Sequence, residues 1–353
     1  MIRRLVGVLL AASTLFALVA GGASAEAPAG PRLTFLRWDA SQLGLFSADP
    51  AGADQRLIAG GGHKARPLPY PFSPPAWSGD GTRVAFTGVS PGKDDPRLDI
   101  YVAMADGSGL ERVPGTRDGF YPVLSPDGQT LAFARKRERQ ASRPRRGEVT
   151  VFESIAIWLL DLRTGVVRQL TPWRNGLHQY PSSFSPDSST LAISRDQRRH
   201  SRPTLRSALS LRLDGSASTV LARHAADPVY SPDGMKLALI STGATRTFES
   251  SDGKTTITST EIAIANADGS GLTKLTHTSA VELEPSWDPS GRRLAYTQLP
   301  ADGGKSELGF GDSIMEINAD GTCRTRVLTY PKALLFGATW QPGLGREAGP
   351  MLC

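Results

Sequence analysis

The stretch PVYSPDGMKLALIS, from Pro228 to Ser241, decides how this chain folds. An apolar residue precedes Ser-Pro-Asp-Gly, and an aliphatic run follows two residues after it. Proline fixes φ near about −65° at the first corner of a turn, aspartate can accept a hydrogen bond from its own backbone, and glycine tolerates the positive φ that closes the bend. The stretch therefore predicts a strand, a tight turn and a second strand.

Variants of this phrase recur along the chain at intervals of 46 to 60 residues. The copies begin at Pro75, Pro122, Ser182, Pro228, Pro285 and, in truncated form, Ala338, and the residue before each turn is Trp77, Leu124, Phe184, Tyr230, Trp287 and Trp340 in turn. A second phrase lies between consecutive copies, as in EIAIANADGSGLTKLT from Glu261, and predicts another hairpin around Asp-Gly. Each repeat thus has four strands, here called a to d, which is typical of a β-propeller blade.

The two ends of the chain complement each other. LTFLRWD from Leu33 matches strand b, with strands c and d after it, whereas the last copy, FGATW from Phe336, has strand a alone. Apolar residues alternate almost throughout, and no helix is indicated. We predict an all-β, six-bladed propeller of four-stranded antiparallel blades, closed by pairing strand 336–340 with strands 33–60.

The first 25 residues have the features of an export signal. Arg3 and Arg4 precede an apolar run, and Ala23-Ser24-Ala25 is a small-x-small cleavage site. We therefore predict a signal peptide over 1–25, a single propeller domain over 26–353, and a periplasmic, envelope-associated or secreted protein. No later stretch is long and apolar enough to span a membrane. The formal net charge of +6 is only mildly basic.

The paired phrases resemble the WD-like β-propeller repeats of the TolB family. The resemblance is carried by Trp77 to Phe86, Asp99 to Gly107, Ile262 to Gly269 and Trp287 to Tyr296. It implies a propeller in the cell envelope with a central channel that accepts a peptide. Because Leu33 follows the predicted cleavage site closely, we expect the propeller without the N-terminal α/β domain of TolB. Prolyl-oligopeptidase-like peptidases share such repeats, but they also need a hydrolase domain with Gly-x-Ser-x-Gly, which this sequence lacks.

Long insertions fall in the b–c and d–a connections, so we expect function on the face that carries them. Two neighbouring b–c loops are strongly basic and predict one patch for an anionic protein, envelope polymer or lipid surface. No aromatic residue interleaves with the arginines, which argues against nucleic acid. This basic patch comprises Arg135, Lys136, Arg137, Arg139, Arg143, Arg145, Arg146, Arg195, Arg198, Arg199, Arg202 and Arg206. The alternative interpretation is a pair of solvated loops.

Residues just before each strand a are expected to surround the mouth of the channel. They could seat a small polar ligand or a peptide terminus, or could simply line a solvent-filled channel. This predicted channel mouth comprises Phe120, Tyr121, His178, Tyr180, His224, Asp227, Glu282 and Glu284. The histidines of the d–a connections lie at non-equivalent distances from the next strand, so we predict no metal site. The aspartate of Ser-Pro-Asp-Gly recurs in most repeats, which indicates turn chemistry and not catalysis.

The two cysteines make a geometric prediction. Cys323 lies in the last c–d turn region, and the C-terminal residue, Cys353, follows the last strand a on the same face. A disulfide between them would contribute roughly 3 to 4 kcal/mol in the chain-entropy model. Taken together, the sequence predicts a monomeric, non-catalytic binding scaffold without a cofactor, which engages a protein, a peptide or an anionic envelope component. The alternative is a metal-assisted hydrolase or lyase acting on envelope carbohydrate at the channel mouth.

Overall fold

The computed structural model describes residues 31–62, 68–69, 73–90, 97–140, 151–199, 202–250, 253–299, 313–330, 333–343 and 351. At 62, 68, 90, 139–140, 151–152, 199, 202–204, 243–250 and 253–258 it describes the backbone alone. The described residues form β-strands and turns with no helix, as predicted. No helix among them could therefore cross a membrane.

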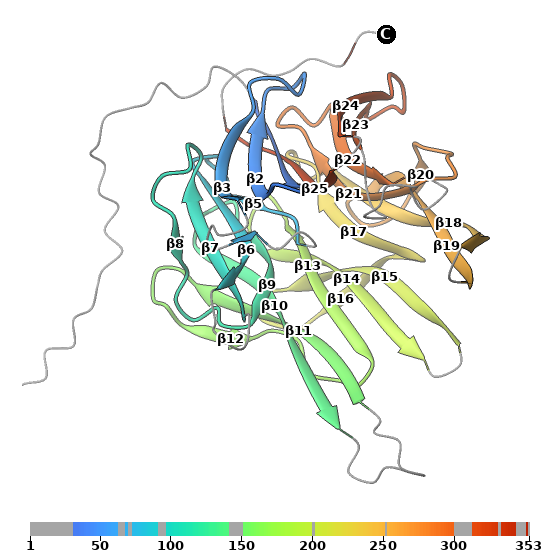
Figure 1. The fold of residues 1–353 in the computed structure, drawn as a ribbon. Coiled ribbons are helices and arrows are strands. Elements are labelled where there is room, and N and C mark those ends of the chain that lie inside the picture. Colours follow the sequence, from blue (N-terminus) through green and yellow to red (C-terminus); the bar gives the residue numbers. More distant parts are fainter. Residues whose placement is uncertain are drawn as a thin grey trace, which may run out of the picture.

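One sheet combines the two ends of the chain. Its strand order is β25 (Leu334–Trp340), β1 (Leu33–Trp38), β2 (Gln42–Ala48) and β3 (Arg56–Gly62). β1 pairs with β25 antiparallel, from Leu33 opposite Trp340 to Trp38 opposite Leu334. The predicted pairing of the C-terminal strand with the N-terminal strands is therefore present in the structure (Figure 1).

The next sheet follows along the chain. It contains β4 (Leu68–Pro69), β5 (Ala76–Trp77), β6 (Arg83–Ser90), β7 (Arg97–Met104) and β8 (Glu111–Arg112). Both β4 and β5 pair with β6, so the inner strand of this sheet is interrupted. Proline has no N–H to donate, and Pro74 and Pro75 stand directly before β5, where pairing resumes.

The remaining strands form two eight-stranded sheets, so hydrogen bonding gives four sheets instead of the six separate blades we predicted. The first holds β9 (Gly119–Leu124), β10 (Thr130–Gln140), β11 (Val151–Asp161), β12 (Val167–Gln169), β13 (Leu177–Phe184), β14 (Thr190–Arg199), β15 (Arg202–Arg212) and β16 (Ser218–Arg223). The second holds β17 (Ala225–Tyr230), β18 (Lys236–Ser250), β19 (Gly253–Asn266), β20 (Thr273–Lys274), β21 (Val281–Trp287), β22 (Arg293–Leu299), β23 (Ser313–Asn318) and β24 (Thr325–Thr329). Each sheet is two antiparallel four-stranded groups joined by a single parallel pair, Ile155 with His178 or Thr260 with Val281.

Apolar residues of neighbouring groups pack face to face. Phe86 of β6 and Phe336 of β25 share one cluster, and Phe133 of β10 and Ile100 of β7 share another. A further cluster places Phe35 of β1 with Ile314 of β23, so the sheet that holds both termini also packs on the last group of the chain. Burial of alternate residues from every group thus accounts for the period-2 pattern in the sequence.

The repeated turn has the chemistry predicted for it. In the copy at Pro228, Ser231 Oγ donates to Asp233 Oδ1 at 2.6 Å, and the Met235 N–H donates to the same oxygen at 2.9 Å. Gly234 has φ of 71°. The prediction that this aspartate is a turn residue is therefore confirmed.

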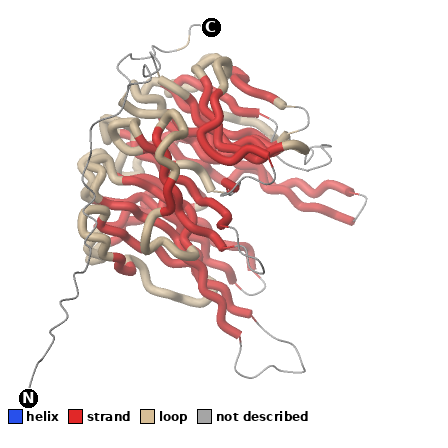
Figure 2. The backbone as a smooth tube through the Cα atoms, turned by 60° about the vertical axis from the view of Figure 1, so that its left-hand side comes forward, coloured by secondary structure: helices blue, strands red, loops and turns tan. Residues whose placement is uncertain are grey.

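Three b–c hairpins extend beyond the others. β10–β11, β14–β15 and β18–β19 lengthen on the same side of the molecule, away from the short turns (Figure 2). The β18–β19 ladder continues from Lys236 opposite Asn266 to Ser250 opposite Gly253.

Candidate functional site

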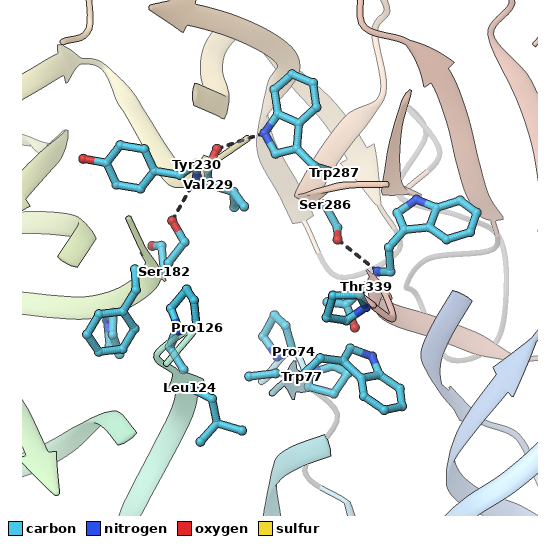
Figure 3. Close-up of a pocket in the computed structure, with 18 of the residues that line it drawn as sticks. Pro74, Trp77, Leu124, Pro126, Ser182, Val229, Tyr230, Ser286, Trp287 and Thr339 are labelled. Carbon is cyan, nitrogen blue, oxygen red and sulfur yellow. Dashed lines mark hydrogen bonds between the residues drawn. The ribbon is translucent and has the colours of Figure 1, made fainter. Parts of the chain in front are cut away.

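A cavity of about 440 Å³ lies among the first strands of the repeats. Its lining comes from β5, β9, β13, β17, β21 and β25 and from the turns that follow these strands (Figure 3). We call it the central cavity, and it is lined by Pro74, Pro75, Ala76, Trp77, Gly79, Tyr121, Pro122, Val123, Leu124, Pro126, Pro181, Ser182, Ser183, Phe184, Pro186, Asp227, Val229, Tyr230, Ser231, Pro232, Glu284, Pro285, Ser286, Trp287, Thr339, Trp340 and Pro342.

Prolines and aromatic rings make most of this wall. One set of prolines lies just before or within the first strands, and a second set comes from the segments that follow these strands, namely Pro126, Pro186, Pro232 and Pro342. Apart from the single parallel pairs at His178 and Val281, the described first strands have a partner on one side only, and an unpaired edge accommodates proline without loss of a ladder hydrogen bond. The central cavity is therefore rigid and largely apolar.

Bulges in the first strands direct particular side chains toward the cavity. Register shifts interrupt the pairing of β9, β17, β21 and β25 with their neighbours. At or beside these shifts, Tyr121, Asp227, Glu284 and Gly337 all have φ between 50° and 63°. Glycine adopts this conformation without strain and aspartate tolerates it, whereas holding Tyr121 and Glu284 in it costs of order 1 kcal/mol or more each.

Neighbouring repeats stabilise these strained residues through hydrogen bonds. The Tyr121 N–H donates to Ser73 Oγ at 2.9 Å, and the Asp227 N–H donates to Ser194 Oγ at 2.7 Å. The Gly337 N–H donates to Glu284 Oε2 at 2.6 Å. A β-carbon on Gly337 would lie 2.9 Å from Pro75 Cδ, which explains glycine at this position.

Two carboxyl groups thus stand in the cavity wall, on adjacent first strands. Asp227 Oδ1 accepts a hydrogen bond from Ser194 Oγ at 3.1 Å, and Glu284 Oε2 also accepts one from Thr297 Oγ1 at 3.3 Å. Burial raises the pKa of Asp227, and burial together with the charge of Asp227 raises the pKa of Glu284 to about 7. Both side chains retain some exposed surface, which faces the cavity that they line.

The predicted channel mouth divides in the structure. Tyr121, Asp227 and Glu284 line the central cavity. Phe120, Tyr121 and Tyr180 form an aromatic cluster, in which the Tyr121 and Tyr180 ring centroids are 5.2 Å apart. His178 lies next to this cluster, and its Nδ1 is 3.4 Å from Tyr180 Oη.

The last two residues of the predicted channel mouth, Glu282 and His224, also do not line the cavity. Glu282 is completely buried and accepts hydrogen bonds from Thr276 and Thr278, which gives it a structural role. His224 is exposed and contributes its carbonyl to Thr242.

Acidic neighbours pair with several cations of the predicted basic patch. Lys136 Nζ lies 2.5 Å from Glu153 and 2.7 Å from Glu138, Arg198 lies 3.5 Å from Glu153, and Arg206 lies 3.4 Å from Asp196. These carboxylates reduce the positive charge that the patch presents to a partner.

For the remaining members of the basic patch, the structure describes the side chain in some cases, only the backbone in others, and neither in the rest. Arg135 stacks over Trp158 and donates to the carbonyl of Gly115. Arg137 and Arg195 lie on described strands and form no ion pair with another described residue. Only the backbone is described for Arg139, Arg199 and Arg202, and Arg143, Arg145 and Arg146 lie outside the described residues.

His178 lies beside these charges. It is only 3% exposed, and its Nε2 is 3.8 Å from Glu153 Oε2. Burial and the charge of Arg198 lower its pKa, so the ring is neutral at pH 7. No group of three or more His, Cys, Asp or Glu side chains within the described part of the chain could hold a metal ion.

The C-terminal tail lies beside the last c–d turn. Cys323 is disulfide-bonded, and its sulfur is 3.2 Å from the carbonyl oxygen of Met351. Met351 and Asn318 exchange two hydrogen bonds, at 3.0 and 3.1 Å. Cys353 is the other cysteine of the sequence and lies outside the described residues, so the pairing of Cys323 with Cys353 stays a prediction.

Comparison with known proteins gives structural relatives only. No protein-family model matches the sequence, and no curated protein matches it either. TolB from Acinetobacter baumannii superimposes with a TM-score of 0.62 at 20% identity, over 90% of this chain and 68% of that one. A putative TolB from Agrobacterium tumefaciens gives 0.55 at 17% identity, over 88% and 98%. The fold is a TolB-like β-propeller. This TolB-like propeller also resembles hydrazine synthase from Kuenenia stuttgartiensis, with a TM-score of 0.61 at 13% identity over 89% of this chain and 47% of that one.

Sequence reasoning missed most of the central cavity of this TolB-like propeller. We expected function on the face of the b–c and d–a connections, whereas the cavity extends from the bulges to the a–b turns. The signal was present in the prolines of the repeated phrase, because these prolines lie on or next to the first strand of each repeat, and the first strands together line the cavity. We interpreted them as turn residues only.

Proposed function

We propose that this chain is an exported, non-catalytic binding protein, in which six four-stranded blades surround the central cavity. Three observations support the six-blade interpretation: the division of each eight-stranded sheet at a single parallel pair, the pairing of β1 with β25, and the packing of the first sheet on the last group. Export is supported by the signal-like sequence of residues 1–25.

The cavity is the observation that carries the binding function. Its volume of about 440 Å³ is in the range of ligand sites, and its wall is apolar with a few polar groups at defined positions. Proline and aromatic surfaces of this kind suit a short peptide segment, because they offer rigid contacts at little entropic cost. A peptide segment of a partner protein is therefore the ligand that we propose.

The basic patch is a second candidate surface. It retains the strongly basic sequence of the two loops, although Glu153 and Asp196 pair with several of its described cations. A metal-assisted hydrolase or lyase is the alternative function. Metal analysis of the purified protein tests it, and a stoichiometric transition metal would contradict our proposal.

One capture experiment compares the two surfaces. The chain without residues 1–25 is immobilised and exposed to a peptide library, and retained peptides are identified by mass spectrometry. Ser182→Trp fills the cavity, because Ser182 lines it and is partly exposed. Val166→Trp is the matched control, since Val166 is 58% exposed in a c–d turn. A third variant changes Arg143, Arg145, Arg146, Arg198 and Arg199 to Ser.

We expect Ser182→Trp to lose the peptides that wild type and Val166→Trp retain. The arginine variant is expected to keep them. If the arginine variant loses binding and Ser182→Trp keeps it, the basic patch is the binding surface and the cavity proposal is wrong. Thermal unfolding of each variant establishes that it is folded.

A further inference from the structure

The charges of the central cavity are of one sign. Among the described residues, its lining contains Asp227 and Glu284 but no lysine, arginine or histidine. The positive charge of Arg206 acts to lower the pKa of Asp227, but Arg206 already pairs with Asp196 and does not line the cavity. Two acidic groups thus stand in a largely apolar enclosure without a cation inside it. Burying such a charge is costly unless a partner of opposite sign is supplied.

The aromatic rings around these carboxyl groups favour a particular kind of partner. Trp77, Trp287 and Trp340 line the cavity together with Tyr121 and Tyr230. The faces of such rings attract ammonium and guanidinium groups, more strongly where water is excluded. A calcium ion would instead need about six to eight oxygen ligands, and the two carboxyl groups of this lining supply at most four.

The indole nitrogen atoms of the three tryptophans differ in their hydrogen bonding. Trp340 is 4% exposed and Trp77 is 9% exposed, and the Nε1 atoms of both are buried without a hydrogen-bond partner among the described residues. Trp287, in the equivalent position, donates its Nε1–H to the carbonyl of Val229 at 3.0 Å. Because the Nε1 atoms of Trp77 and Trp340 have almost no accessible surface, they do not open onto the cavity, and the indoles can offer a ligand only their rings.

We infer that the group that enters the central cavity is an organic cation, a primary ammonium or a guanidinium on an apolar stem, and that Glu284 and Asp227 receive it. This inference rests on the proposed function and specifies its ligand. In a peptide, a lysine or arginine side chain or the N-terminal amine supplies the cation.

Three probes of similar shape test the charge requirement. Phenethylamine is cationic, 2-phenylethanol is neutral and 3-phenylpropionate is anionic, and isothermal titration calorimetry measures each at about pH 8. We expect wild type to bind the amine at least about tenfold more tightly than the alcohol, because a charge-assisted hydrogen bond is roughly twice as strong as a neutral one. The anion is expected to bind most weakly.

Isosteric variants locate the charge. Glu284→Gln keeps an acceptor for the Gly337 N–H, and Asp227→Asn suits a residue at φ of 50°. Each variant should lose most of the preference for phenethylamine, while its affinity for 2-phenylethanol should stay unchanged. Glu316→Gln is the matched control, since Glu316 is also a buried glutamate with a raised pKa but does not line the cavity. It should leave the preference intact.

The preference should also depend on pH. Phenethylamine stays protonated between about pH 5.5 and 8. Glu284, with a pKa of about 7, loses its charge as the pH falls, so the preference should fall with it. The other titratable groups facing the cavity are Asp227, Tyr121 and Tyr230, with Arg206 and Asp196 beyond Asp227.

Three outcomes would overturn the inference. They are equal binding of the amine and the alcohol by wild type, failure of the amine to bind, and binding of calcium ions that Glu284→Gln abolishes without any binding of the amine. Peptide capture that Ser182→Trp blocks would leave the proposed function standing in each case, so the two proposals fail separately.

Discussion

Exposed and buried carboxyl groups affect the stability of this fold with opposite dependence on pH. Turn aspartates such as Asp233 accept hydrogen bonds from Ser231 Oγ and a backbone N–H, and these bonds lower their pKa. The pKa values of Glu284 and Glu316 are instead raised to about 7, chiefly by burial. The turn aspartates therefore stabilise the fold at pH values above their unfolded pKa of about 4 and lose this contribution in acid. The buried glutamates stabilise the fold below their unfolded pKa of about 4.5, and this contribution is lost as the pH rises to about 7.

Glu316 gives the test of this second window. Arg293 Nη1 donates to Glu316 Oε2 at 3.1 Å, and Arg293 also lies 3.6 Å from Asp288, so two buried carboxylates share one cation. Because the folded state binds the Glu316 proton more tightly than the unfolded state, stability should fall as pH rises from about 4.5 to 7. The rise in the pKa of Glu316 from 4.5 to about 7 corresponds to a loss of about 3 kcal/mol in the free energy of unfolding.

We expect Glu316→Gln to gain stability relative to wild type between pH 5 and pH 8. Urea unfolding at the two pH values measures the difference. Asp233→Asn should show no such gain, since the lowered pKa of Asp233 acts in more acidic solution. An equal effect of Glu316→Gln at both pH values would contradict the assignment.

Repetition made some residues predictable and left others hidden. Asp233 could be assigned to turn chemistry because its neighbours in sequence also form its contacts. Glu284 could be placed near the channel, but its contact with Gly337 depends on a bulge and on a strand 53 residues away. The alternation of apolar and polar residues cannot reveal such a bulge, because the strained residue is held in place by hydrogen bonds to the neighbouring repeat.

At the scale of elements, the long hairpin of β18 and β19 separates into an inner and an outer part. Ile240 and Ile262 of the inner part belong to a buried cluster, whereas the pairs from Thr245 and Thr258 onward extend beyond it. The register shifts between Thr242 and Thr245, which marks the boundary.

Deletion of residues 245–258 should leave the fold intact. It joins Thr242 to Thr260 through Gly243, Ala244 and Ser259, which is a loop of the length common in hairpins. We expect the melting temperature to change by only a few degrees, as measured by circular dichroism. Ile240→Ala, at a residue 3% exposed, is the contrasting variant and should cost about 2 to 5 kcal/mol. Loss of cooperative unfolding in the deletion variant would show that the outer part is needed.

At the scale of the whole molecule, the sequence predicted the fold class and the meeting of the two ends, but not how the sheets connect. The parallel pairs Ile155–His178 and Thr260–Val281 join groups that we expected to be separate. Each depends on a single residue pair, and no local pattern encodes a contact of this kind. The site was harder to predict than the fold, because it is built where six distant strands converge.

The C-terminal tail supplies the whole-molecule prediction. Thiol titration of unreduced, denatured protein should find no free cysteine, and Cys353→Ser should expose one thiol. The variant with both cysteines changed to Ser should lose roughly 3 to 4 kcal/mol in the chain-entropy model, while Met351 keeps its two bonds to Asn318. Two free thiols in the wild-type protein would contradict the predicted disulfide.

The pairing of β1 with β25 also has a consequence for the time course of folding. These strands lie about 300 residues apart in the sequence, and the cost of bringing them together grows with the length of chain between them. In a chain delivered from its N-terminus, β1 must wait beside β2 and β3 until the last strand arrives. Its edge and the apolar residues Leu33 and Phe35 are unprotected during that interval. The final step of folding, and the period of greatest risk of aggregation, is therefore the one that joins the two ends.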